Sequence, residues 1–170
     1  MPITICISDS STLIHLAAIG RLALLRKFYG KITIPSAVWQ EVVVEGKSRA
    51  GAAEVRRASE AGWIEVAPPQ DEVLIRLLKR ELDEGESEVI ALAVEQGSAE
   101  VLLDESDARQ IAELYSIPKT GVIGLLIRAK QEGEVGSLRQ ELDRLCDEAG
   151  FWIREEFYRE ILQSVGELNP

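Results

Sequence analysis

Four acidic residues occur where a parallel α/β sheet would bring separate parts of the chain together: Asp9, Glu41, Glu86 and Asp104. Asp9 closes the mostly apolar run at residues 3–7, and Asp104 closes the run at 101–103. In such sheets, ligand sites form beyond the carboxyl ends of the strands, where loops and first helical turns meet. Carboxylates gathered there repel one another by about 1 to 4 kcal/mol per close pair. Because a divalent cation would offset that repulsion, the first hypothesis is a magnesium- or manganese-dependent enzyme.

The chemistry of such a site follows from the ligands that these ions prefer. Magnesium takes carboxylate oxygens in octahedral geometry and keeps several waters, so a few acids can hold it. The site could then position a hydroxide and stabilise charge on a phosphodiester. Taken singly, each acid also has a structural explanation, as a helix cap, as a first-turn acid or as a solvent-facing side chain. Those explanations do not predict that the four acids would lie together at the ends of the strands.

Other chemistries are poorly represented in the chain. One His (His15) and two distant Cys nearly exclude a zinc site with N and S ligands. The glycines at 121–124 lack the full dinucleotide pattern and the Walker Lys, and no G-x-S-x-G motif occurs. His15 is expected to be packed or half-exposed rather than catalytic. Trp39, Trp63 and Trp152 are expected in the core rather than as base-stacking platforms.

Charge and composition limit the possible partners. The net charge of −10 argues against a broad nucleic-acid-coating surface, but it allows an enzyme that contacts nucleic acid only at its cleft. The 170 residues, 46% of them hydrophobic, suit a single domain over 1–170 with a real core. No apolar stretch approaches the roughly 20 residues that span a bilayer, and no signal peptide is recognisable. We therefore expect a cytoplasmic protein without membrane contact.

The elements that must position these acids alternate along the chain. We expect strands at 3–7, 32–34, 63–66 and 101–103, and a short edge strand beginning at 117–118. Helices are expected between them, among them 36–46, 86–96, 105–115 and 122–131, with two C-terminal helices at about 135–148 and 154–165. This alternation predicts an α/β fold: a three-layer α/β/α sandwich around a central parallel sheet of about four to five strands.

Five segments carry distinctive motifs: SDSSTLI at 8–14, IPSAVWQEV at 34–42, GESEVIALA at 85–93, LDESDAR at 103–109 and TGVIGLL at 120–126. In order and spacing they resemble the PIN domain family of metal-dependent ribonucleases. The likeness is greatest to a small prokaryotic branch related to the toxin ribonucleases of toxin–antitoxin pairs. The segments cover most of residues 5–133, and GFWI at 150–153 is similar to that branch's C-terminal end.

The resemblance implies a role for each matching residue. Asp9, Glu41, Glu86 and Asp104 would be the catalytic acids that hold Mg²⁺ or Mn²⁺. Asp107 would be an auxiliary acid of the metal site, and Ser11 would orient the first carboxylate. Glu88 could exchange roles with Glu86. Toxins usually have Asp where this chain has Glu, and the longer side chain places its carboxylate differently. The resemblance therefore leaves open whether one or two ions bind. Arg109 and Lys119 are candidate substrate-binding residues near the cleft.

The expected function is hydrolysis of RNA phosphodiester bonds, as the toxin of a toxin–antitoxin pair. A small antitoxin protein and a second copy of the chain, in a homodimer, are the expected partners. One alternative is a catalytically weak PIN-like module that binds nucleic acid or protein. Another is a phosphoacceptor receiver domain, which also has acids and a Lys at strand ends. Receivers, however, need paired acids directly after the first strand, and Asp9 is followed by Ser10.

Overall fold

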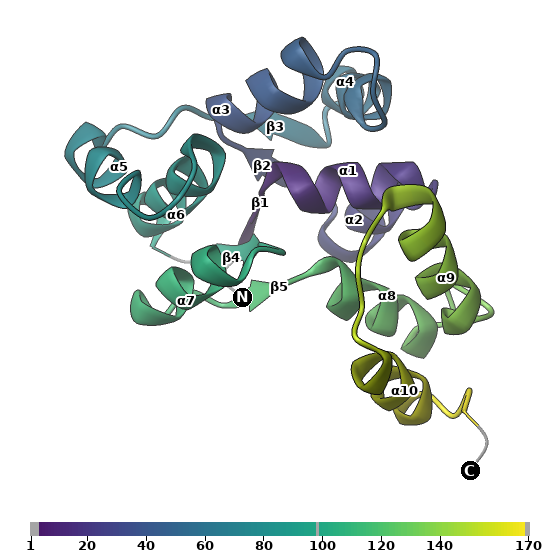
Figure 1. Ribbon diagram of the computed structural model, residues 1–170. Helices are drawn as coiled ribbons and strands as arrows, with labels where there is room; N and C mark the ends of the chain where they lie inside the picture. The colour runs from purple at the N-terminus through teal and green to yellow at the C-terminus, as the bar shows by residue number, and fades with distance from the viewer. Residues whose placement is uncertain (1–3, 98, 169–170) are drawn as a thin grey trace.

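The computed structural model describes residues 4–97 and 99–168. A sheet of parallel strands runs through its centre, with helices on both faces (Figure 1). The strands are β1 (Ile5–Ser8), β2 (Ile32–Ile34), β3 (Ile64–Val66), β4 (Ala99–Leu102) and β5 (Lys119–Thr120). The predicted α/β/α fold around a parallel sheet is confirmed, with five strands.

The order of the strands in the sheet is β3-β2-β1-β4-β5. The chain first builds outwards from β1 through β2 to β3, then returns to place β4 on the other side of β1. The direction of winding therefore reverses between β1 and β4, which pair in register from Ile5 with Ala99 to Ser8 with Leu102. In open parallel sheets, this switch point is where the crevice for a ligand opens. Asp9 and Asp104 follow these two strands.

The α-helices of the described residues are α1 (Ser10–Ala18), α2 (Ala23–Tyr29), α3 (Ser36–Trp39), α4 (Ala52–Glu60), α5 (Glu72–Leu78), α6 (Glu84–Gln96), α7 (Ser106–Leu114), α8 (Val122–Gln131), α9 (Leu138–Ala149) and α10 (Glu155–Ser164). Figure 1 shows α6 and α7 on one face of the sheet, and α1, α2 and α8 on the other. Helix α9 packs on α1 and α8. None of these helices combines the length and the apolar composition needed to cross a membrane.

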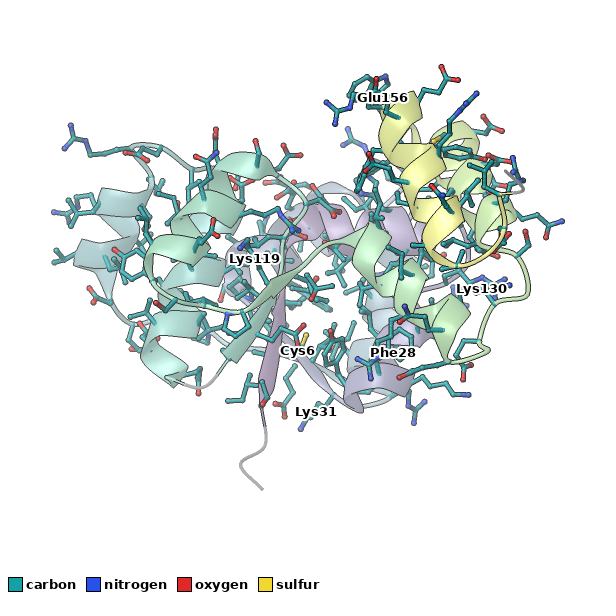
Figure 2. The ribbon with its side chains drawn as sticks, turned by 90° about the horizontal axis from the view of Figure 1, so that it is seen from below. Cys6, Phe28, Lys31, Lys119, Lys130 and Glu156 are labelled. Atoms are coloured by element: carbon teal, nitrogen blue, oxygen red, sulfur yellow. The ribbon has the colours of Figure 1, made fainter. Side chains whose placement is uncertain are left out.

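The inner strands are buried on both faces, as parallel strands between helices are. Ile7 of β1 and Leu102 of β4 are fully buried in the same apolar cluster as Leu16 of α1 and Ile90 of α6. Burial of one such side chain contributes about 1.5–3 kcal/mol. Cys6 of β1 is buried (Figure 2), and burial raises the pKa of its thiol far above the usual range. This packing fixes the strand ends that carry the acids.

The structure differs from the sequence-based expectation at three places. The single helix expected over 36–46 is α3 followed by a π-helix, η1 (Gln40–Glu45), in which three consecutive β-branched valines disfavour a tight α-helix. The first strand begins at Ile5, and residue 3, where it was expected to begin, lies outside the described residues. The edge strand is at Lys119–Thr120, because Pro118 has no N–H and contributes only its carbonyl, which accepts from the Val101 N–H.

Candidate active site

Asp9 both caps a helix and joins two strands. Its Oδ1 accepts a hydrogen bond of 2.8 Å from the N–H of Thr12 in the first turn of α1. Its Oδ2 accepts one of 3.3 Å from the N–H of Asp104, the second residue after β4. The Asp9 side chain is thereby held, almost completely buried, at the switch point of the sheet.

Asp104 contacts two helices, α1 and α8, through its carboxylate. Oδ1 accepts a 2.8 Å hydrogen bond from the N–H of Val122, the first residue of α8, where the helix dipole favours negative charge. Oδ2 lies 3.3 Å from the donor Thr12 Oγ1 and 3.1 Å from His15 Nδ1. Gly121 permits this approach, because a Cβ there would lie only 2.9 Å from Asp104 Oδ1. Asp104 therefore accepts from the first turn of α8, and α7, the helix that follows it in the chain, has no side-chain cap at Glu105.

The electrostatics of this pair are unfavourable for two negative charges. Burial, and secondarily the charge of Asp104, raises the pKa of Asp9 from 3.8 to about 7. Hydrogen bonds from Thr12 and from the Asp104 N–H oppose the shift only in part. A cation beside the pair would favour the ionised form of Asp9.

Glu41 and Glu86 come to the same place from other elements. Together with Asp9 they line a pocket of about 20 Å³, roughly the space for one water molecule. Ser10 Oγ donates to Glu41 Oε2 at 2.9 Å, whereas Glu86 forms a capping box with Asp83 at the start of α6. Burial, followed by the nearby charge of Asp83 and further acids, raises the pKa of Glu86. Three of the four predicted acids thus surround one small pocket.

The remaining residues named from the resemblance lie around this pocket or beside it. Ser11 lines the pocket but makes no hydrogen bond to Asp9 within the described residues. Glu88 is turned to α3, where Oε1 accepts from the N–H of Ala37 at 3.1 Å. Asp107 is exposed in the first turn of α7, and its charge contributes to the raised pKa of Glu86.

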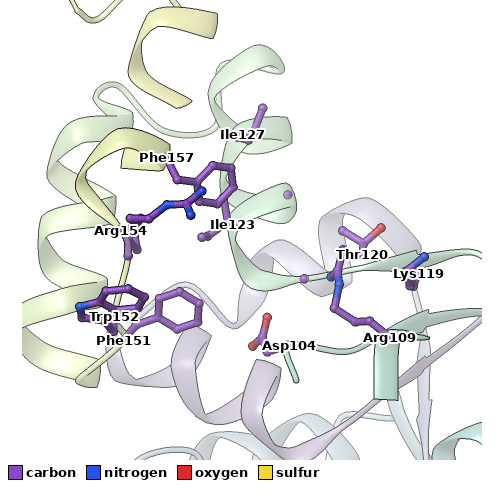
Figure 3. Close-up of a pocket in the computed structure, with 13 residues that line it drawn as sticks. Asp104, Arg109, Lys119, Thr120, Ile123, Ile127, Phe151, Trp152, Arg154 and Phe157 are labelled. Carbon is purple, nitrogen blue, oxygen red and sulfur yellow. The ribbon is translucent and has the colours of Figure 1, made fainter. Parts of the chain in front are cut away.

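Arg109 and Lys119 line a second, larger pocket of about 730 Å³ that also includes Asp104. Arg109 Nη1 donates to the Leu103 carbonyl at 3.0 Å, and Lys119 Nζ lies 3.9 Å from Glu113. Figure 3 shows Asp104 between these two cationic residues on one side and an aromatic group from the C-terminal segment on the other.

Sequence reasoning set His15 aside as a site residue. His15 is half-buried, as expected, but its ring also contacts Asp104 and packs edge-on against Phe151 at 5.0 Å. The spacing of Asp9, Thr12 and His15 could have revealed them, because residues three apart share one side of a helical segment. Trp152, expected in the core, is 81% exposed, so that expectation was wrong. Trp39 and Trp63 do pack against the core.

The side chains at the switch point suit a hard divalent cation by their chemistry, since all four are carboxylates. Within residues 4–97 and 99–168, however, no three acidic, His or Cys side chains are close enough together to hold one ion directly. An ion that retains several waters needs only one or two direct carboxylate ligands. Asp9 and Asp104 place that number of carboxylates at the switch point.

Comparison with known proteins accords with this geometry. A family model described as a PIN domain matches residues 5–167, nearly the whole chain. Proteins with this domain are generally nucleases and typically bind divalent metals. No curated protein matches the chain.

Proposed function

Because the chain belongs to the PIN domain family, we propose that it is a divalent-metal-dependent endoribonuclease that hydrolyses RNA phosphodiester bonds. One observation carries the proposal: the Asp104 N–H donates to the buried Asp9 carboxylate at the switch point of the sheet, where burial and, secondarily, the charge of Asp104 raise the pKa of Asp9. A purely structural pair of carboxylates would have no need of this repulsion.

In this proposal Asp9, Glu41, Glu86 and Asp104 hold Mg²⁺ or Mn²⁺, directly or through water, with Asp107 nearby. A bound cation would supply positive charge against the phosphate oxygens. The chain's own polar groups orient the acids, since Thr12 and His15 contact Asp104 and Ser10 donates to Glu41.

The substrate would lie in the larger pocket beside Asp104. Arg109 and Lys119 line this pocket, and their charges would attract the RNA backbone. Arg109 is anchored by its bond to the Leu103 carbonyl, which keeps the guanidinium near the acid pair.

A direct test compares cleavage of labelled RNA in Mn²⁺, in Mg²⁺ and in EDTA by the wild type, Asp104→Asn and Asp147→Asn. Asp147 is an exposed acid on α9 that lines neither of the two pockets, and it serves as the matched control. The proposal predicts metal-dependent cleavage that Asp104→Asn abolishes and Asp147→Asn retains. Equal cleavage by all three proteins would refute the assignment.

A catalytically weak module that binds nucleic acid or protein is the second candidate. It is favoured by the lack, among the described residues, of a preformed set of three metal ligands, and by the net charge of −10. For such a module, a metal would bind without RNA cleavage. If the chain is a nuclease, the acid variants should lose metal binding and RNA cleavage together. If it is a binding module, there is no cleavage to lose.

We further propose that the chain acts as a toxin neutralised by a small antitoxin protein, and that it forms a homodimer. The resemblance to toxin ribonucleases supports both. Exposed apolar side chains on α5 and α7 (Val73, Leu77 and Leu114) offer surface for such contacts. Light scattering of the purified chain would test the dimer, and growth arrest on expression, relieved by a co-expressed neighbouring open reading frame, would test the toxin role.

A further inference from the structure

We infer that the larger pocket is a groove for single-stranded RNA in which Trp152 stacks on an unpaired nucleobase. The inference rests on the nuclease function proposed above and adds a specificity element to it. The groove lies between the start of α8 and residues 151–157, and it extends to Asp104 (Figure 3).

The aromatic side of the groove is unusually open to solvent. Trp152 is 81% exposed and Phe157 is 41% exposed, although both are large apolar side chains. Phe151, the neighbour of Trp152, packs edge-on against His15 and so ties this segment to the acid site. An exposed aromatic surface beside a cleft requires explanation, whereas scattered exposed apolar residues do not.

The charges in the groove identify the ligand class. Arg109, Lys119 and Arg154 line it, and Asp104 is the acid among its lining residues. Within the described chain, Arg154 forms no ion pair, and the partner of Lys119 is as far away as 3.9 Å. Local positive charge in a chain of net charge −10 suits a polyanion. This combination of cations and exposed aromatics favours a polynucleotide over an apolar peptide.

The exposed indole selects single strands over duplexes. A nucleobase can stack on an aromatic side chain only when its own face is free, which in RNA means an unpaired nucleotide. A strand that follows the cations from Arg154 towards Arg109 passes Asp104, so the backbone would run past the acid pair. The RNA-binding groove and the acid site are therefore neighbours, and a variant can impair binding in the groove without removing the acids.

Binding of a labelled single-stranded RNA of about 12 nucleotides, measured by fluorescence anisotropy in EDTA, tests the inference without cleavage. We expect Trp152→Ala to weaken binding by about tenfold or more, and Trp152→Phe by less than about threefold, because the phenyl ring still stacks. Tyr115→Ala removes an exposed aromatic directly after α7, outside the groove, and should leave the affinity unchanged. Quenching of tryptophan fluorescence by the RNA should disappear in Trp152→Phe.

A salt titration tests the charged side of the groove. Arg154→Ala should reduce the magnitude of the slope of log affinity against log salt concentration by about one, whereas Arg56→Ala, on the exposed face of α4, should not.

Equal affinity of the wild type and Trp152→Ala, or equal affinity for the single strand and its duplex, would refute the proposed groove and leave the proposed nuclease function intact. Conversely, Trp152-dependent binding in a chain that never cleaves RNA would support the groove and refute the nuclease.

Discussion

The N–H of Asp104 donates to Oδ2 of Asp9, joining two residues that are 95 positions apart in the chain. This 3.3 Å contact links the ends of β1 and β4, where the winding of the sheet reverses. The Asp9 carboxylate is buried there with the charge of Asp104 nearby, and both effects make its ionisation costly. The stability and the activity of the protein should therefore both depend on the charge of Asp9.

Stability should vary with pH through Asp9. Its pKa is raised from 3.8 to about 7, so between these values the folded state binds more protons than the unfolded state. The free energy of unfolding of the wild type should then fall as the pH rises through this window. Asp9→Asn keeps a capping oxygen without the charge, and at pH of about 8 it should be more stable than the wild type by about 1–4 kcal/mol.

Urea denaturation in EDTA across this pH range would measure the effect. The advantage of Asp9→Asn should shrink as the pH falls towards about 4, where the wild-type carboxyl is protonated in the folded state and partly protonated in the unfolded state. Asp147→Asn provides the control. A difference between Asp9→Asn and the wild type that did not change with pH would contradict the electrostatic explanation.

Gly121 should be intolerant of a side chain for reasons of space, not of backbone conformation. A Cβ would lie 2.9 Å from both Asp104 Oδ1 and Arg109 Nη1, and 3.4 Å from the Leu103 carbonyl oxygen. Gly121→Ala should displace the Asp104 carboxylate from the Val122 N–H, lowering cleavage by about tenfold or more and stability by about 1–3 kcal/mol. Gly136→Ala, with open space around its Cβ, should change neither. Normal cleavage by Gly121→Ala would show that the position of Asp104 is unimportant.

Two adjacent serines should differ in their effect on activity. Ser10 is buried and donates to Glu41 Oε2 at 2.9 Å, whereas Ser11 only lines the small pocket. A hydrogen bond to a charged group contributes about 1.5–3 kcal/mol, so Ser10→Ala should reduce cleavage by about tenfold or more. Ser11→Ala should have a smaller effect. The reverse order in initial rates would favour Ser11 as the residue that orients a carboxylate.

Much of the fold was predictable because its signals are local. Short β-branched runs next to capping residues identified the strands, and alternation with helices identified a parallel sheet. The π-helix at Gln40–Glu45 was not predictable, since hydrophobic periodicity alone does not distinguish it from an α-helix. The short edge strand depended on its pairing with β4, a contact between distant parts of the chain.

The site was predictable only as far as strand ends determine it. Asp9 and Asp104 follow the two strands at the switch point, and Glu41 and Glu86 lie in the helices expected at 36–46 and 86–96. His15 was missed because its partner, Asp104, is 89 residues away. Trp152 was misplaced because it lies in a short connection between α9 and α10, where no periodic pattern indicates burial.

His15 should support Asp104 rather than the fold. Its Nδ1 lies 3.1 Å from Asp104 Oδ2, and the ring is partly exposed. His15→Ala should lower cleavage by about tenfold while changing the free energy of unfolding by less than about 1 kcal/mol. In His15→Asn, an amide near the position of Nδ1 should restore part of the activity. Equal loss in both variants, measured as initial rates in Mn²⁺, would instead indicate that the ring's packing against Phe151 matters most.

The most direct measurement of the central claim is calorimetric titration of Mn²⁺ and RNA cleavage on the same samples of the wild type, Asp9→Asn and Asp147→Asn. The acid pair predicts that the wild type and Asp147→Asn bind Mn²⁺ and cleave RNA, and that Asp9→Asn loses both while remaining folded. If Asp9→Asn bound Mn²⁺ and cleaved RNA as well as the wild type, the Asp9–Asp104 pair would not be the metal site.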